Sequence, residues 1–174
     1  MLAFILPALL ATTTAVLGGE RMKLESTAFK EGEVIPSKYT CEGIDVSPPL
    51  VWSGSPQDTK SFVLIVDDPD APIGTFTHWV VYDIPANVGG FAEDLPKVKE
   101  IEGIKQGIND FGYVGYGGPC PPKGHGYHRY FFRIYAVDLE NLGLPSGASR
   151  RQVEERMKGH ILGEASLMGR YKRD

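Results

Sequence analysis

Hydrophobic residues gather in short runs whose lengths are typical of β-strands. Residues 61–66 form an almost unbroken apolar run, which predicts a central strand buried on both faces. Residues 79–84 and 130–137 are rich in branched and aromatic side chains, and they predict two further strands. Weaker patterns predict strands at residues 24–29, 50–53 and 104–109.

A helical pattern occurs only near the C-terminal end. Ser149 and Gln152 have the spacing of a capping box, in which each side chain satisfies a free backbone N–H group. Apolar side chains then recur every four residues as far as Ile161, which predicts a helix with one buried stripe. A second short turn is expected at residues 165–171. Strands followed by a terminal helix predict an antiparallel, β-dominated α+β fold.

Composition and charge narrow the class of protein. The 21 glycines and 13 prolines are spread along the chain, as expected for turns between short elements, and they argue against a helical bundle. No repeat or linker divides the chain, so residues 22–174 are expected to form a single domain. The formal net charge is -4, and the sequence has no stripe of basic residues of the kind that binds nucleic acids. No nucleic-acid partner is therefore expected.

The first residues of the chain have a composition of their own. Residues 1–19 contain no charged side chain, and the apolar run at 2–10 is followed by small residues, as in a secretory signal. However, no Lys or Arg precedes the run, and Met22 resembles a natural chain start. Residues 1–21 are therefore interpreted as a signal peptide, a membrane tether or an extended start. The first two imply an exported or tethered protein, and the third a cytoplasmic one.

Two cysteines, Cys41 and Cys120, are compatible with one disulfide. In an exported chain, a bond closing this long loop would stabilise the fold by about 4 kcal/mol in the chain-entropy model. In a reducing cytosol, both would remain thiols. The sequence leaves both alternatives open.

The candidate chemistry lies in the loops beside the strands. Asp68 and Asp70 follow the strongest predicted strand, and the prolines between and after them stiffen the turn that holds the two carboxylates. His78 opens the next strand. Two carboxylates should repel an anion, so we expect one to accept a hydrogen bond from an imidazole, to stay protonated, or to meet a ligand's ammonium group.

A second loop, residues 115–126, is rich in glycine and proline. Its free N–H groups could form a concavity for an anion, while the prolines keep the loop rigid. The loop leads to His128 and Tyr130, whose side chains can donate hydrogen bonds to phosphate oxygens. The His125-x-x-His128 spacing fits no known metal motif, so no metal site is expected.

These motifs together resemble a known family. The Asp-Pro-Asp-Ala-Pro element at 68–72, the Thr-His-Trp step at 77–79 and the Gly-Pro-Cys-Pro-Pro to His-Arg-Tyr stretch at 118–130 are similar to the signatures of the phosphatidylethanolamine-binding proteins, also called Raf kinase inhibitor-like. The Ile-Pro pair at 35–36, together with Tyr-Thr-Cys at 39–41 and Ser-Pro-Pro-Leu at 47–50, resembles the bacterial and archaeal branch. The resemblance covers about residues 23–172.

The resemblance implies a large antiparallel sheet packed on a smaller sheet, with a C-terminal helix. It also implies a pocket for phosphate, phosphoethanolamine or a similar anion, with no cofactor and no catalytic residue. Carried over by motif, the residues of this anion site are Asp68, Asp70, His78, Gly117, Gly118, Pro122, His128 and Tyr130.

The expected function is therefore that of a non-enzymatic binding protein for a small phosphorylated group or a lipid head group. Family members also suggest a regulator or inhibitor of a kinase or serine protease. The Pro-Cys insertion at 119–120 departs from the animal branch, so kinase regulation transfers poorly. The alternatives are a serine protease inhibitor that acts through a surface loop, independently of the pocket, and a phosphate- or metal-dependent hydrolase.

Overall fold

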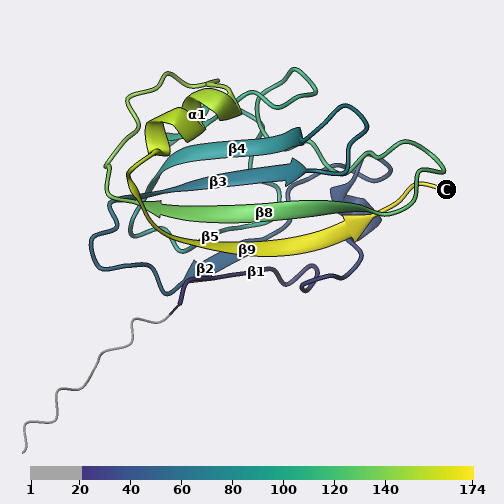
Figure 1. The fold of residues 1–174 in the computed structure, drawn as a ribbon, viewed down its shortest axis with the longest axis horizontal. Helices are drawn as coiled ribbons and strands as arrows, with labels where there is room; N and C mark the ends of the chain where they lie inside the picture. The colour runs from purple at the N-terminus through teal and green to yellow at the C-terminus, as the bar shows by residue number, and fades with distance from the viewer. Residues whose placement is uncertain (1–20) are drawn as a thin grey trace, which may run out of the picture.

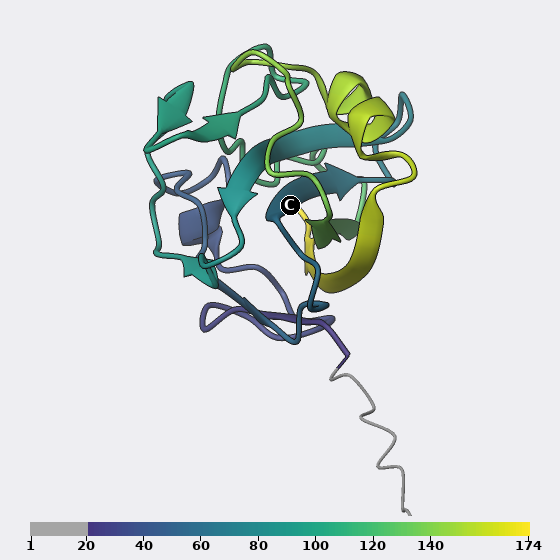
Figure 2. The ribbon, with the colours of Figure 1, turned by 90° about the vertical axis from the view of Figure 1, so that its left-hand side faces the viewer.

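The computed structural model describes residues 21–174, which form two antiparallel sheets and one helix (Figures 1 and 2). The strands are β1 (Lys23–Glu25), β2 (Leu50–Ser53), β3 (Ser61–Asp68), β4 (Phe76–Pro85), β5 (Gly90–Phe91), β6 (Glu100–Ile101), β7 (Ile104–Gln106), β8 (His128–Val137) and β9 (Ile161–Tyr171); α1 is Arg150–Met157 and a 3-10 turn, η1, is Ser37–Tyr39. The larger sheet has the order β6-β7-β4-β3-β8-β9 and the smaller one β1-β2-β5. The predicted fold class is confirmed.

Strand β3 is buried along its whole length, as its continuous apolar run predicts. It lies between β4 and β8 in the larger sheet. Because side chains alternate along a strand, Leu64 and Val66 enter a core shared with the smaller sheet, whereas Val63 and Ile65 enter a second core beneath α1. Figure 2 shows α1 and the smaller sheet on opposite sides of the larger sheet.

The helix begins where the sequence predicts and ends earlier. The Ser149 hydroxyl accepts a hydrogen bond from the Gln152 N–H group, and both halves of the capping box are present. The predicted stripe reaches only Met157, because the chain turns at Gly159, whose φ of 82° lies in the left-handed region that favours glycine. The prediction that Ile161 belongs to the helix was wrong, because Ile161 begins β9 and its side chain is 45% exposed.

The short turn expected at residues 165–171 was also wrong, because this segment belongs to β9. The strand pairs antiparallel with β8 over the full length of both strands, from Val137↔Ile161 to His128↔Tyr171. Leu167, Gly169 and Tyr171 are buried at alternate positions, as one face of a strand requires. Pairing with β8 therefore determines the structure of this segment.

A disulfide joins Cys41 to Cys120 across a sequence separation of 79 residues. It connects the chain after η1 to the loop that precedes β8. The expected signal, tether or extended start lies almost wholly outside the described residues. Within residues 21–174, the one helix is too short and too polar to cross a membrane.

Candidate anion-binding site

The three central strands bring their polar ends together. Strand β3 ends at Asp68, β4 begins at Phe76 and β8 begins at His128, and antiparallel pairing places these residues at one end of the sheet, on the right in Figure 1. A pocket of about 260 Å³ lies there. Its lining consists of Asp68, Ala71, Pro72, Ile73, Phe76, His78, Phe111, Cys120, Pro121, Pro122, His128 and Tyr130.

A β-bulge directs His78 into the pocket. Val66 of β3 pairs with Trp79, and the next residue, Asp67, pairs with Thr77, so His78 is the extra residue of β4. A bulge changes the direction of a side chain that regular alternation would place on the other face. The His78 ring consequently packs edge-on against Tyr130, with ring centroids 5.2 Å apart.

The hydrogen bonds of His78 fix its tautomer. Nδ1 lies 2.6 Å from the carbonyl oxygen of Gly117, and because a carbonyl only accepts, Nδ1 carries the proton. Burial lowers the pKa of His78, although the Gly117 carbonyl and the Asp68 carboxylate act in the opposite direction. The ring is therefore neutral near pH 7, and Nε2 presents a lone pair.

Asp68 and His128 form a hydrogen-bonded chain that continues to His125. The Asp68 Oδ2 atom lies 2.7 Å from His128 Nδ1, and His128 Nε2 lies 2.7 Å from His125 Nδ1. Asp68 Oδ1 accepts a hydrogen bond from the Asp70 N–H group. Both carboxylate oxygens and both nitrogens of His128 are thus occupied, and His128 could donate to an anion only after displacing the exposed His125.

Asp70 lies outside the pocket lining. Its carboxylate accepts hydrogen bonds from Arg129 Nε at 2.9 Å and Arg129 Nη2 at 2.7 Å. These bonds lower the pKa of Asp70 to about 2. The pair fastens the loop after β3 to the start of β8. The expected repulsion between an anion and two carboxylates is thereby reduced, because one carboxylate is paired with Arg129 and the other with His128.

The two glycines expected to bind the anion lie outside the pocket lining. The Gly117 N–H group donates to the His78 carbonyl, and that of Gly118 donates to Asp45 Oδ1. A Cβ atom on Gly117 would lie 2.5 Å from the Phe111 ring, and one on Gly118 would lie 2.3 Å from the Tyr39 carbonyl. The glycines therefore allow close packing, and their N–H groups are not free for a ligand.

Tyr130 supplies the free donor of the site. Its side chain is 1% exposed and lines the pocket, and its hydroxyl makes no hydrogen bond of good geometry within residues 21–174, although the Asp68 carboxylate lies close enough to interact with it. Burial and the neighbouring Asp68 carboxylate raise the pKa of Tyr130, so the phenol keeps its proton. A buried donor without a partner is costly, and an anion in the pocket would satisfy it.

The sequence matches a known family over nearly all of the described chain. The family model described as phosphatidylethanolamine-binding protein matches residues 25–172. The chain belongs to the phosphatidylethanolamine-binding protein family. It is 64% identical over 157 residues to a UPF0098 protein of Aquifex aeolicus, covering 90% of this chain and 92% of that one. A UPF0098 protein of Pyrococcus abyssi is 52% identical over 159 residues, with coverages of 90% and 88%.

Solved structures agree. YbcL of Escherichia coli, described as a new member of the mammalian PEBP family, superposes with a TM-score of 0.83 at 36% identity, covering 88% of this chain and 99% of that one. A phosphatidylethanolamine-binding protein homologue from Chlamydia trachomatis gives 0.80 at 43% identity, with the same coverages. A carboxypeptidase Y inhibitor, solved in complex with its cognate proteinase, shares the fold with a TM-score of 0.52 at 21% identity. The match covers 88% of this chain and 83% of that one.

The outer wall of this family member's pocket is apolar, a feature that the sequence did not reveal. Phe76 and Phe111 pack edge-on with centroids 4.8 Å apart, and Ile73 is 88% exposed at the mouth. Pro121 and Pro122 form another part of the wall, next to the Cys120 disulfide. Within residues 21–174, no three His, Cys, Asp or Glu side chains are grouped to hold a metal ion.

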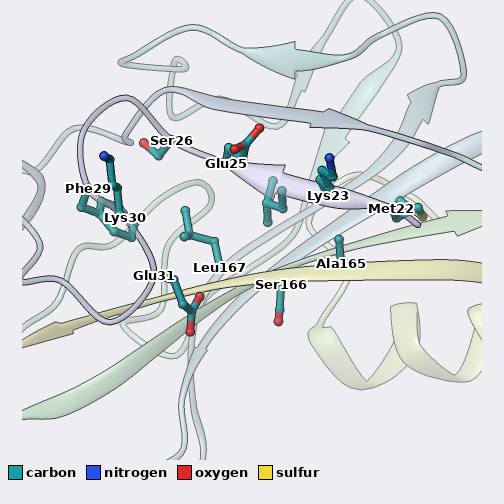
Figure 3. A pocket seen from close by; sticks show the side chains of 11 residues that line it. Met22, Lys23, Glu25, Ser26, Phe29, Lys30, Glu31, Ala165, Ser166 and Leu167 are labelled. Carbon is teal, nitrogen blue, oxygen red and sulfur yellow. The ribbon is translucent and has the colours of Figure 1, made fainter. Parts of the chain in front are cut away.

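A larger cavity of about 610 Å³ lies elsewhere, between β1 and β9 (Figure 3). Its floor includes the buried Leu24 and Leu167, while Lys23 and Glu25 are exposed. Its ionisable lining residues are all exposed to solvent, unlike Asp68 and the histidines of the smaller pocket. The smaller pocket is therefore the better candidate site.

Proposed function

We propose that this chain is a non-enzymatic binding protein, whose pocket takes a phosphate or phosphoethanolamine-type group. One observation carries the proposal: the hydroxyl of Tyr130 is a buried proton donor inside the pocket that makes no well-formed hydrogen bond within the described residues, with the Asp68 carboxylate nearby. Anionic oxygens accept such hydrogen bonds strongly. The rings of His78 and Tyr130 pack edge-on with centroids 5.2 Å apart and both line the pocket, so both side chains can contact one ligand.

The apolar wall suits a ligand that is more than a bare ion. Phe111 and Ile73 border the polar floor, so a substituent on the phosphate would lie against carbon atoms as it leaves the pocket. An ethanolamine or glycerol group is of suitable size for a pocket of about 260 Å³. The lipid head group and the free phosphorylated molecule share this chemistry.

Titration with O-phosphoethanolamine, followed through the ring signals of the histidines by NMR, tests the proposal. We expect His78 and His128 to shift and saturate, whereas His160, which pairs with Asp138 far from the pocket lining, stays in place. Tyr130→Phe removes only the free hydroxyl, and we expect it to weaken binding by about 1–3 kcal/mol.

His160→Ala is the matched control and should bind with the affinity of the wild type. Unchanged His78 and His128 signals at millimolar ligand would refute the proposal. An unaltered affinity of Tyr130→Phe would remove this hydroxyl from the site, and with it the observation on which the proposal depends.

A protein partner is the second candidate. The neighbouring carboxypeptidase Y inhibitor is bound to its cognate proteinase, and the shared fold makes an inhibitory surface worth testing here. Inhibition of a serine carboxypeptidase by the wild type and by Tyr130→Phe separates the two candidates. Equal inhibition by both proteins would support a surface that is independent of the pocket, and no inhibition by either would exclude this partner class.

A further inference from the structure

The polar groups of the pocket limit the charge and protonation of a ligand. Among the described residues that line it, none is Lys or Arg, so no permanent positive charge faces a bound anion. The ionisable groups of the lining are Asp68, His78, His128 and Tyr130. Two guanidinium groups lie next to the lining. Arg129 is taken by Asp70, and Arg173, which lies 3.4 Å from the Cys120 Sγ atom and from the Pro121 carbonyl oxygen, has Glu42 as its counter-charge at 3.5 Å. A doubly charged phosphate would therefore be poorly compensated.

His78 adds a requirement for a proton. Its Nδ1–H group faces the Gly117 carbonyl, with the Gly118 backbone also close by, which leaves Nε2 as the polar atom that the ring can offer to the pocket. In a neutral imidazole this nitrogen only accepts. An unprotonated phosphate oxygen would meet a lone pair there, whereas a P–OH group would donate to it.

The surroundings keep this imidazole neutral. Phe76, Phe111 and Tyr130 pack against the ring, and the charged groups that face it are Asp68 and Asp110. Burial lowers the pKa of His78 in spite of these two carboxylates. The free phenol of Tyr130 donates and Nε2 of His78 accepts, so the pair is complementary to one P–O⁻ and one P–OH group.

We propose that the pocket selects phosphate groups that retain a proton, namely singly charged phosphomonoesters, and discriminates against phosphodiesters, because Nε2 of His78 accepts the hydrogen bond of the P–OH group. This inference rests on the proposed function and specifies its ligand class. A phosphodiester, such as an intact diacyl phospholipid carrying an ethanolamine head group, is also singly charged but has no P–OH group. Charge alone cannot distinguish the two ligands, whereas the donor requirement does.

Calorimetric titration with methyl phosphate and with dimethyl phosphate tests this selection. At pH 6 we expect methyl phosphate to bind about tenfold more tightly than dimethyl phosphate, a difference that corresponds to one satisfied hydrogen bond. The ratio of the methyl phosphate affinity to the dimethyl phosphate affinity should fall about fiftyfold between pH 6 and pH 8. The reason is that the second pKa of a phosphomonoester is about 6, so its monoanion is nearly absent at pH 8. The ratio cancels changes in the protein that affect both ligands.

A variant of the acceptor gives the second readout. His78→Phe keeps an aromatic ring of similar shape, and thermal unfolding checks that this variant folds. At pH 6 it should bind methyl phosphate and dimethyl phosphate about equally. His160→Ala should retain the preference of the wild type. Equal binding of both ligands by the wild type, or a methyl phosphate affinity that holds at pH 8, would overturn the inference and leave the proposed function intact.

Binding of neither ligand would instead overturn the proposed function, and the inference with it. A parallel titration with dihexanoyl phosphatidic acid, a lipid monoester, distinguishes the two sources of such a group. Binding tighter than that of methyl phosphate identifies a lipid head group, and equal or weaker binding a soluble metabolite. Either result is consistent with the monoester preference, provided that the corresponding dihexanoyl phosphatidylethanolamine binds at least about tenfold more weakly.

Discussion

Asp67 and Asp68 are neighbours at the end of β3, yet they serve opposite faces of the same sheet. The Asp67 carboxylate points toward α1 and pairs with two arginines, Arg133 at 2.6 Å and Arg150 at 2.9 Å. Asp68 points toward the smaller sheet and pairs with His128 at 2.7 Å. Both carboxylates are almost fully buried. The two faces therefore differ in the partner of the carboxylate and not in its burial.

The choice of partner distinguishes the Asp68 carboxylate, which lines a pocket, from the Asp67 carboxylate, which is enclosed between α1 and the sheet. Arginine is always charged, so Asp67 with Arg133 and Arg150 forms a fixed ionic cluster that ties α1 to the sheet. A histidine ring has two nitrogen atoms, so His128 can pair with Asp68 through one nitrogen while the other reaches His125. The Asp68–His128 pair lines the pocket and continues to the exposed His125, whereas the Asp67 cluster is enclosed between α1 and the sheet.

Removing the disulfide should have the largest effect, and it should act on the pocket face. Cys41→Ala/Cys120→Ala frees a loop of 79 residues, and the chain-entropy model gives a loss of about 4 kcal/mol in the free energy of unfolding. Urea denaturation measures this loss, and reduction of the wild type under native conditions is the control. A loss below about 1 kcal/mol would show that the Pro121–Pro122 wall is held by packing alone.

Breaking the ionic cluster should affect stability but not the ligand. Asp67→Asn leaves Arg133 without its counter-charge beside a buried site, while Arg150 retains Glu154, and we expect a loss of about 2–3 kcal/mol. Since both arginines are partly exposed, water limits the cost. Phosphoethanolamine affinity, measured by calorimetry, should match that of the wild type. A weaker affinity would mean that the two faces are coupled through β3.

The corresponding change on the pocket face should affect the ligand more than the stability of the fold. Asp68→Asn retains the size of the side chain but removes the charge that orients His128, and we expect about 1 kcal/mol less stability. Ligand affinity should change severalfold, because the His128–His125 chain loses its anchor. If stability falls as far as in Asp67→Asn while affinity stays constant, the Asp68–His128 pair is structural.

The sequence predicted the pocket face better than the edge of the sheet. Loop motifs identified Asp68, His78, Pro122, His128 and Tyr130, all of which line one pocket. A local pattern is sufficient there, because these residues stand directly at strand ends. The sequence did not predict that His78 reaches the pocket through a bulge, since a register shift depends on the neighbouring strand.

Strand β9 shows the opposite case. Its inward positions include Gly163, Ala165 and Gly169, whose small side chains hide the two-residue period. A Cβ atom on Gly169 would lie 2.4 Å from the Ile35 side chain, so long-range packing and not local propensity requires glycine there. Asp70 was misplaced for a similar reason: its partner Arg129 lies 59 positions away along the chain.

The smallest expected effect concerns the Asp70–Arg129 pair at the rim between the two faces. Its hydrogen bonds lower the pKa of Asp70 from 3.8 to about 2. A depressed folded-state pKa contributes stability above pH 3.8, and this contribution is lost as the pH falls from 3.8 toward 2. Because both side chains are partly exposed, the contribution should be about 0.5 kcal/mol.

Asp70→Asn is therefore expected to unfold about 0.5 kcal/mol more easily than the wild type at pH 7 and equally easily near pH 2, as measured by urea denaturation at each pH. Glu164→Gln, which removes an exposed carboxylate on β9, is the matched control and should show no such convergence. A constant difference between Asp70→Asn and the wild type across this range would assign the effect to loop packing. In that case the Asp70 carboxylate would resemble neither Asp67 nor Asp68, since its charge would contribute nothing.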